Sequence, residues 1–311
     1  MIIGKDRPKV LVIMASYNGE LYIENQIESI LNQEQVDVNI FIQDDNSCPR
    51  NVKYLEKITH SNKNIFVKYN DRNFGSAGQN FFDIIRNIDL NGYEYIALSD
   101  QDDLWAKNKI IKGIKKINQL KLSGYSCAVE AFWPSGKIKK ISQSSSINDT
   151  DFLFEGAGQG CTFVLTNKFF KKIQTFCNEN IVLTKDFYYH DWFIYILCRS
   201  WEEKWFFDKN TYIKYRQHGN NDIGARSGFK AILSRIKLIK DGWYKKQVKL
   251  AIKIAIKANA NSSSLYKAIN FFNMPNIKFR KLRLIFFILK NGRRKLIDKL
   301  VQIFSALFGF L

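Results

Sequence analysis

The first 120 residues alternate short apolar runs with helix-like segments, and this alternation constrains the fold more than any other feature of the chain. Val10–Ala15 is continuous, apolar and rich in β-branched residues, as a strand buried on both faces should be. Comparable runs at Val36–Ile42, Ile65–Tyr69 and Tyr93–Leu98 are separated by segments with apolar residues at helical spacing, and Leu104–Leu122 has the pattern of a Lys-rich amphipathic helix. Such alternation predicts an α/β domain with a mostly parallel sheet and helices on both faces.

Polar clusters follow three of the predicted strands. They are Ser16-Tyr17-Asn18, Asp44-Asp45 and Asp100–Asp103. In parallel α/β sheets, ligands bind beyond the carboxyl ends of the strands. The sequence therefore predicts one ligand site, built from these three clusters at one edge of the sheet.

The stretch Asp100-Gln101-Asp102-Asp103 carries the sharpest chemical signal. Three carboxylates in four residues repel one another and resist burial unless a cation compensates them. A hard divalent ion that bridges carboxylate and diphosphate would do so. Taken alone, the stretch also fits a solvated acidic turn or a helix N-cap.

The other clusters have two interpretations each when taken alone. Asp44 and Asp45 could accept hydrogen bonds from a base or from ribose hydroxyls, or they could form a turn and an N-cap. Asp191, at a predicted helix start after His190, could be a general base or a cap. His218 lies among polar residues suited to phosphate or metal, or it could be a hydrogen-bonded structural group.

Charge divides the chain into two parts. The net charge is +19, and residues 225–311 hold 20 Lys and Arg against two acidic residues. This division predicts a nearly neutral domain at 1–224 and a basic, helical region at 225–311. A basic region of this kind favours an anionic partner such as a membrane surface, nucleic acid or a phosphorylated substrate.

The end of the basic region has the pattern of an amphipathic helix. Apolar residues repeat at helical spacing from Leu296 to Leu311, with Lys295, Lys299, Gln302 and Ser305 on the other side. We therefore expect 225–311 to contact a membrane surface or to mediate homo-oligomerisation.

No apolar run is long enough to predict a transmembrane span. Five cysteines without a paired spacing indicate reduced thiols, typical of the cytoplasm.

Six motifs together resemble one enzyme family. They are Ser16-Tyr17-Asn18-Gly19, Gln43-Asp44-Asp45-Asn46-Ser47, Asp100-Gln101-Asp102-Asp103-Leu104-Trp105, Gly158-Gln159-Gly160-Cys161-Thr162, His190-Asp191-Trp192 and Tyr215-Arg216-Gln217-His218-Gly219-Asn220-Asn221. Residues 8–224 resemble the family 2 glycosyltransferases, and more narrowly their bacterial rhamnosyltransferase-like branch. The resemblance implies a GT-A fold, which is a Rossmann-like mixed sheet flanked by helices.

The resemblance also implies how a nucleotide-diphosphate sugar is held. The donor-binding residues by match are Ser16, Tyr17, Asn18, Asp44, Asp45, Asp100, Gln101 and His218. Asp102 would be the direct ligand of Mn²⁺ or Mg²⁺, with His218 as a second ligand. The family often has an Arg-Asn pair after the third strand, where this chain has Gln79-Asn80.

For the acceptor side, the resemblance implies an inverting transfer in which Asp191 is the catalytic base. His190 stands where the family usually has Glu, and His190, Trp192 and Trp133 are candidate acceptor contacts. The acceptor would be a hydroxyl of a glycan, or of a sugar chain on a polyprenyl diphosphate. The enzyme would then be cytoplasmic and peripheral on the inner face of the cell membrane.

Three alternatives stay open from the sequence. The donor could be UDP-galactose or UDP-glucose instead of a rhamnose donor. A nucleotidyltransferase would also use carboxylates and a divalent ion, but Ser16–Glu20 lacks the basic residue of its phosphate loop. A nucleic-acid-binding protein would suit the basic tail but not the acidic clusters, so we expect no nucleic-acid partner.

Overall fold

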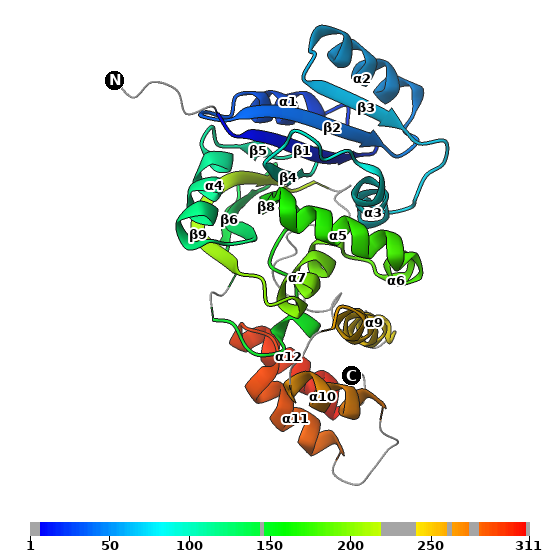
Figure 1. Ribbon diagram of the computed structural model, residues 1–311, viewed down its shortest axis with the longest axis vertical. Coiled ribbons are helices and arrows are strands. Elements are labelled where there is room, and N and C mark those ends of the chain that lie inside the picture. The colour runs from blue at the N-terminus through cyan, green and yellow to red at the C-terminus, as the bar shows by residue number, and fades with distance from the viewer. Residues whose placement is uncertain (1–6, 144–145, 219–240, 260–262, 274–279, 309–311) are drawn as a thin grey trace. The chain divides into compact units, whose positions relative to one another are not determined.

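The computed structural model describes residues 7–143, 146–218, 241–259, 263–273 and 280–308 (Figure 1). The chain divides into two compact units. The first comprises 1–143, 158–180 and 204–224, and the second comprises 144–157, 181–203 and 225–311. Parts of two regions singled out in the sequence, the cluster at 215–221 and the basic tail, lie outside the described residues.

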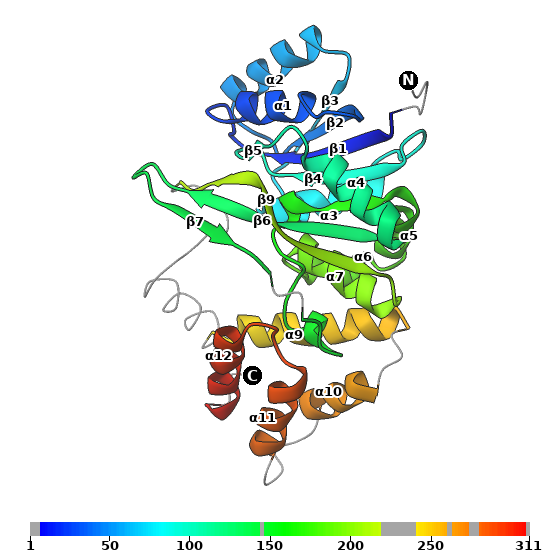
Figure 2. The ribbon, with the colours of Figure 1, turned by 90° about the vertical axis from the view of Figure 1, so that its left-hand side faces the viewer.

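A mixed sheet forms the centre of the first unit. Its strands are β1 (Lys9–Ser16), β2 (Asp37–Asp44), β3 (Ile65–Tyr69), β4 (Tyr95–Ser99), β5 (Leu104–Trp105), β6 (Gly124–Phe132), β7 (Ile138–Ile141), β8 (Val164–Thr166) and β9 (Trp205–Arg216). The order is β3-β2-β1-β4-β8-β6-β9-β5, and β7 pairs with β6 as a hairpin that Figure 2 shows in profile. Strands β1 to β4 are parallel, whereas β8 runs antiparallel to both β4 and β6.

The parallel half follows the sequence closely. Val10, Val12, Ile13 and Met14 of β1 are fully buried, as their continuous apolar run predicts. The polar residues that follow β1, β2 and β4 lie at one edge of the sheet because the three strands are adjacent and parallel.

Helices flank this sheet, and their bounds differ from the sequence prediction at one important place. The helices of the first unit are α1 (Ile23–Leu31), α2 (Pro49–Ser61), α3 (Ala77–Asn87), α4 (Lys109–Leu120) and α5 (Asn167–Glu179), with a short 3-10 turn η2 (Gly160–Thr162). The sequence predicts a helix from Leu104, but Leu104 and Trp105 form β5, antiparallel to β9, before α4 begins. Pairing with a distant strand overrides the local helical pattern there.

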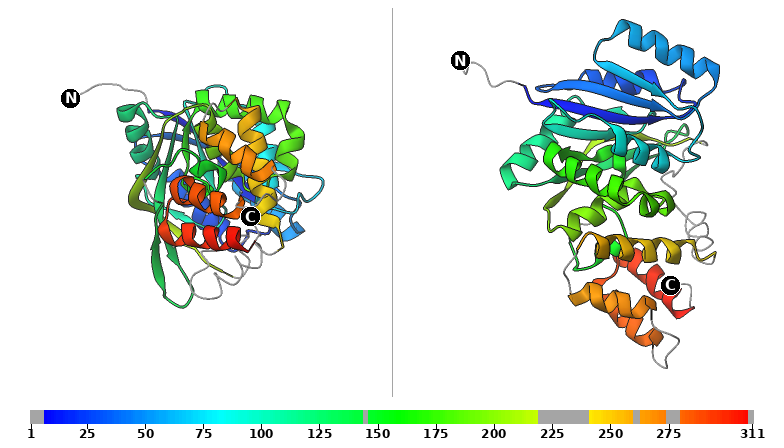
Figure 3. Two further views of the ribbon diagram at one scale, coloured as in Figure 1. Left: turned by 90° about the horizontal axis from the view of Figure 1, so that it is seen from below. Right: turned by 45° about the vertical axis from the view of Figure 1, so that its right-hand side comes forward.

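The second unit is helical. Its elements are η1 (Asp151–Leu153), α6 (Ile181–Asp186), α7 (His190–Ser200), α9 (Trp243–Lys257), α10 (Ser263–Asn273), α11 (Arg280–Asn291) and α12 (Leu296–Leu307). Figure 3 shows the helices of the tail, coloured orange to red, as short rods, and α11 packs against α12. Within the described residues, no helix is long and apolar enough to cross a bilayer.

A buried ionic cluster holds the second unit together. Asp151 is fully buried and accepts hydrogen bonds from Tyr195 Oη at 2.9 Å and from Arg294 Nη1 at 2.6 Å. Arg199 also pairs with Asp151. Because Tyr195 and Arg199 belong to α7 and Arg294 lies between α11 and α12, one carboxylate connects α7 to the C-terminal helices.

The segment around η1 makes further contacts of the same kind. Trp192 Nε1 in α7 donates to the Phe152 carbonyl at 2.7 Å, and Tyr244 Oη in α9 donates to the Phe154 carbonyl at 2.9 Å. Arg294 Nη2 donates to the Gly156 carbonyl at 2.6 Å. The C-terminal helices are therefore part of the same buried core as α7.

This cluster generates a stability prediction. Arg294→Met should lower the free energy of unfolding by about 3 kcal/mol, because it leaves the Asp151 and Glu155 carboxylates buried with one cation fewer. Urea unfolding followed by tryptophan fluorescence measures the change. The matched control is Arg283→Met on the exposed side of α11, which should change it by less than about 0.5 kcal/mol. Equal stabilities of the two variants would contradict the role given to Arg294.

Candidate active site

The turn after β1 is fastened to the turn after β4 by a reciprocal pair of hydrogen bonds. The Tyr17 backbone N–H donates to Gln101 Oε1 at 2.8 Å, and Gln101 Nε2 donates to the Tyr17 carbonyl at 2.9 Å. A Cβ at Gly19 would lie 2.2 Å from Gln101 Oε1, so a side chain there would push Gln101 away from these hydrogen bonds. The structure thus brings together two of the predicted donor-binding turns.

The turn after β1 is also fastened to the turn after β2. The Asn18 N–H donates to Ser47 Oγ at 2.8 Å, and Asn18 Oδ1 accepts from the Cys48 N–H at 2.9 Å. Asn18 has φ 47°, a left-handed conformation that Asn tolerates better than most residues. The Gly19 N–H donates to Asn51 Oδ1 at 3.0 Å. The turns after all three adjacent strands therefore form one connected layer.

Asp44 lies at the centre of this layer, and its carboxylate is fully buried. It accepts from the Ser47 N–H at 2.9 Å, Ser47 Oγ at 2.6 Å, Asn51 Nδ2 at 2.8 Å and Ser16 Oγ at 3.4 Å. These four donors satisfy the buried carboxylate and fix the turn after β2. The predicted donor-binding roles of Asp44 and Ser16 stay predictions, and the contacts seen here are internal.

Asp45 is held differently from its neighbour. Its carboxylate accepts from the Phe74 N–H at 2.9 Å and from Asn70 Nδ2 at 3.1 Å. Burial raises the pKa of Asp45 above its ordinary value, although these hydrogen bonds oppose the shift. Asp45 thereby connects the end of β2 to the segment that leads into α3.

In the turn after β4, the Asp102 carboxylate lies beside the His218 imidazole. The distance from Asp102 Oδ2 to His218 Nε2 is 2.7 Å, and both side chains are largely buried. Burial raises the pKa of Asp102, whereas the hydrogen bond from His218 opposes the shift. The imidazole ring of His218 stacks on Tyr22, with 4.8 Å between ring centroids. The two side chains predicted as metal ligands are thus adjacent, although 116 residues separate them in sequence.

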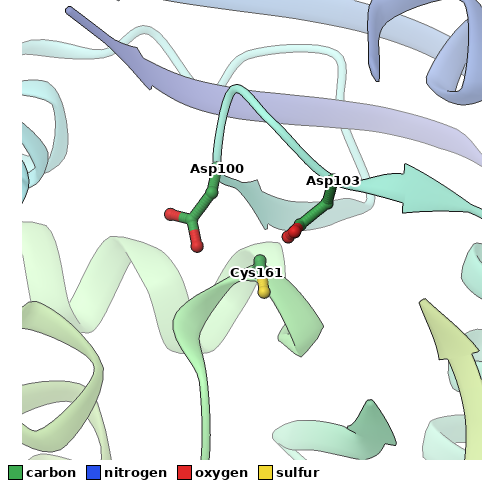
Figure 4. A group of neighbouring side chains, drawn as sticks. All are labelled: Asp100, Asp103 and Cys161. Carbon is green, nitrogen blue, oxygen red and sulfur yellow. The ribbon is translucent and has the colours of Figure 1, made fainter. Parts of the chain in front are cut away.

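A second acidic cluster lies on the same turn. Figure 4 shows Asp100 and Asp103 pointing toward Cys161 of η2, with one potential ligand atom of each within 4.8 Å of the others. Burial and the nearby carboxylates of Asp100 and Asp102 raise the pKa of Asp103 well above its ordinary value. Within the described residues, Asp103 Oδ2 has no hydrogen-bond partner. The turn therefore concentrates negative charge that the protein compensates only in part.

These residues fit a divalent cation. Asp102 offers a carboxylate oxygen and His218 an imidazole nitrogen, and both atom types are ligands that Mn²⁺ accepts. Buried carboxylates with raised pKa values and an orphaned buried oxygen are stabilised by added positive charge. Asp102 and His218 are accordingly the residues that would hold such an ion.

Two basic residues, Arg216 and Lys109, lie close to this turn. Arg216 in β9 donates its N–H to Asp103 Oδ1 at 3.1 Å and its Nε–H to the Asp102 carbonyl at 2.9 Å. Lys109 is fully buried, with its side-chain nitrogen 3.1 Å from the centroid of the Trp105 ring. Burial lowers the pKa of Lys109 to about 7, and the surrounding thiols and carboxylates oppose that shift.

The predicted base and two acceptor residues begin α7 in the second unit. Asp191 Oδ1 accepts from the Trp192 N–H at 2.7 Å, an arrangement of a first-turn carboxylate that also suits the helix dipole. Trp192 is buried and its indole lies 5.3 Å from the ring of Phe187, so its position is that of a core residue. Burial lowers the pKa of His190 to about 3, so this imidazole is neutral.

Trp133 lies elsewhere, in the turn between β6 and β7 of the first unit. Its N–H donates to the Lys137 carbonyl at 3.0 Å, and the Lys137 ammonium lies 5.3 Å from the centre of its ring. The acceptor-binding role of Trp133 stays a prediction.

Sequence reasoning missed several residues that shape the site. Asp103 belongs to the predicted cluster Asp100–Asp103, but Cys161 stands in the sequence only as a member of a motif, and Lys109 carries no expectation of its own. The signal that could have found Lys109 is its place at the start of α4, on the same side of the helix as the buried Gly113 and Ile117. Tyr22 and Asn51 carry no local signal, because their partners are distant in sequence.

Comparison with solved structures shows the class of fold. S. aureus TarS, residues 1–349, in complex with UDP-GlcNAc, aligns with a TM-score of 0.57 at 16% identity, covering 97% of this chain and 80% of that one. The mannosyltransferase PcManGT from Pyrobaculum calidifontis, in complex with GDP-Man and Mn²⁺, gives a TM-score of 0.50 at 12% identity, covering 98% and 86%. The sheet and its helices therefore form the GT-A fold, as the sequence predicts.

Comparison of sequences shows the family. Residues 11–187 match Glycosyl transferase family 2. The dTDP-rhamnosyl transferase RfbG of Shigella flexneri is 35% identical over 89% of this chain and 99% of its own length. A GalNAc(5)-diNAcBac-PP-undecaprenol beta-1,3-glucosyltransferase of Campylobacter jejuni is 26% identical over 96% and 99%. The chain belongs to glycosyl transferase family 2 and to its rhamnosyltransferase-like branch, and it is a glycosyltransferase.

The buried imidazole generates a prediction about acid stability. The pKa of His190 falls from 6.5 in the unfolded chain to about 3 in the folded protein, so only the unfolded state binds a proton between these values. Its contribution to stability is therefore present above pH 6.5 and is lost as the pH falls toward 3. Between about pH 7 and pH 5, this loss amounts to about 2 kcal/mol.

Urea unfolding at these two pH values tests the prediction. His190→Gln should show a smaller loss of stability on acidification than the wild type does. His60→Gln is the matched control, because His60 is exposed on α2. An unchanged pH dependence in the His190 variant would contradict a buried, neutral imidazole.

Proposed function

We propose that this enzyme transfers rhamnose from a dTDP-linked donor to a hydroxyl of a lipid-linked oligosaccharide or a cell-surface polysaccharide precursor, with inversion at the anomeric carbon. The observation that carries the proposal is the connected layer of turns after β1, β2 and β4, which ends in the Asp102–His218 pair. The activity named for the Shigella relative supports the donor, and UDP-galactose or UDP-glucose is the alternative.

The layer supplies what a nucleotide sugar requires. The Tyr17 ring is exposed beside Gln101 and can cover a base, while Asp45 and Asp100 offer acceptors for base or ribose hydrogens. A divalent cation, Mn²⁺ or Mg²⁺, would offset the charge of the diphosphate, and Asp102 and His218 would hold it. Their backbone is fixed by the contacts of Arg216 with Asp102 and Asp103.

Asp191 would act on the acceptor. Its carboxylate would take the proton of the acceptor hydroxyl while that oxygen attacks the anomeric carbon and the bond from this carbon to the phosphate oxygen breaks. The nucleoside diphosphate leaves with the bonding electrons. His190, being neutral, adds no positive charge that would weaken the basicity of Asp191.

We place this reaction at the inner face of the cell membrane, where the tail contacts anionic lipid. The 20 Lys and Arg against two acidic residues in 225–311 support this location, because each basic residue near an anionic leaflet contributes about 1 kcal/mol. The Campylobacter relative, whose name includes an undecaprenol-linked acceptor, supports a lipid-linked acceptor.

A panel of nucleotide sugars tests the donor. We expect dTDP-rhamnose with Mn²⁺ to raise the melting temperature of the protein more than dTDP-rhamnose with EDTA does, and more than UDP-galactose, UDP-glucose or GDP-mannose with Mn²⁺. Thermal denaturation followed by fluorescence measures the shift. A larger shift with a UDP-sugar would make the alternative donor the correct one.

Substitution of the base tests the mechanism. Asp191→Asn should lower kcat by about 10²- to 10⁴-fold and leave donor affinity nearly unchanged, because the amide cannot take the proton. Asp186→Asn on α6 is the matched control and should keep wild-type turnover, since its side chain is exposed. Wild-type turnover by the Asp191→Asn enzyme would show that another group is the base.

A further inference from the structure

Helix α12 buries polar residues and exposes large apolar ones, which is the reverse of an ordinary amphipathic helix at a protein surface. Its polar residues face inward, with Gln302 2% and Ser305 1% exposed, while Leu296 is 71% and Ile297 75% exposed. Gln302 Oε1 has an internal partner, the Arg293 N–H at 3.0 Å. The fold of the second unit therefore uses the small and polar side of α12 and leaves the large apolar side chains outside.

Helix α11 has the same surplus of apolar surface. Leu284, Phe287 and Ile288 are buried, whereas Leu282, Phe286 and Leu289 are exposed. We define the outer face as the exposed large apolar side chains of the two helices, namely Leu282, Phe286, Leu289, Leu296, Ile297, Leu300, Phe304, Leu307 and Phe308. Large exposed apolar side chains gathered on two helices that pack against each other indicate an interaction site.

The positive charge of the same two helices indicates which kind of partner binds the outer face. Lys281, Lys290 and Lys299 belong to the same two helices as the outer face. Among residues 281–308 the only acidic residue is Asp298. A second copy of the chain would bring an equally positive surface, and the two would repel each other. An anionic bilayer offers apolar acyl chains for the outer face together with negative headgroups for the lysines.

We propose that the outer face of α11 and α12 is a lipid-binding surface that lies in the interface of an anionic bilayer. The helices lie on the membrane, since neither is long enough to cross it. This proposal rests on the membrane location given above and names the surface responsible for it. It does not depend on which sugar is transferred.

The C-terminal helices are part of the buried core of the second unit, so the proposal is tested by point substitutions and not by truncation. Removing residues 225–311 would strip Tyr244 and Arg294 from the segment that also contacts α7, so a truncated protein would lose more than lipid contacts. Substitutions on the outer face avoid this problem, because those side chains make no part of the core.

The experiment uses the full chain with Leu300→Glu and Phe304→Glu combined. Vesicles of phosphatidylcholine containing about 30% phosphatidylglycerol, without donor or acceptor, are sedimented with the protein. The wild type should bind these vesicles and bind pure phosphatidylcholine weakly. The variant should bind about 10- to 100-fold more weakly than the wild type, because each substitution removes buried apolar area and adds a negative charge.

A matched control carries the same change elsewhere on the second unit. Ile181→Glu with Val182→Glu replaces two exposed apolar residues of α6 and should bind vesicles as the wild type does. Circular dichroism confirms that both variants fold. Equal vesicle binding by the wild type and the Leu300/Phe304 variant overturns the proposal. So does a wild-type dimer, seen by light scattering, that this variant dissociates while its vesicle binding is kept.

These outcomes are separate from those of the proposed function. Vesicle binding is measured without any substrate, so an incorrect donor or base leaves it unchanged. Conversely, a wild-type protein that ignores vesicles but transfers rhamnose to a water-soluble acceptor analogue would overturn the lipid-binding surface and leave the transferase intact.

Discussion

The structure depends on keeping carboxylates buried at the carboxyl ends of adjacent parallel strands. Asp44 lies fully buried and is stabilised by four donors from its own surroundings, which the turns after β1 and β2 supply. Asp102 and Asp103 have fewer donors, and burial raises their pKa values. That difference separates a structural carboxylate from carboxylates that benefit from an added cation, and it is the physical basis for our proposal of a metal-assisted diphosphate site after β4.

Much of the first unit follows from the sequence, because its parallel strands are short apolar runs whose ends are marked by polar residues. The order of β1, β2 and β4 then brings the three polar clusters to one edge. The pairing of β5 with β9 does not follow, since two residues carry no strand signal of their own. The burial of Lys109 is only weakly signalled locally, because apart from the nearby Trp105 ring its surroundings include the thiols of Cys127 and Cys161 from distant elements.

The second unit was harder to predict for a related reason. Its central contact joins Asp151 to Arg294, which are 143 residues apart. The local sequence around either residue therefore does not predict the ion pair. Helical spacing in α12 correctly separates an apolar side from a polar side, but spacing alone does not tell which side faces the core. In the structure the polar side of α12 faces the core and the large apolar side chains are exposed, and this reversal supports our proposal that the tail binds a membrane surface.

The most direct test of the account is a titration of Mn²⁺ into the protein in the presence of dTDP, followed by electron paramagnetic resonance of the free ion. The account predicts that the wild type binds Mn²⁺ together with the nucleotide, that Asp102→Asn loses this binding, and that Asp83→Asn, at a surface ion pair with Lys68, retains it. Undiminished Mn²⁺ binding by the Asp102→Asn protein would contradict the central claim that the carboxylate at the end of β4 is there to hold a cation.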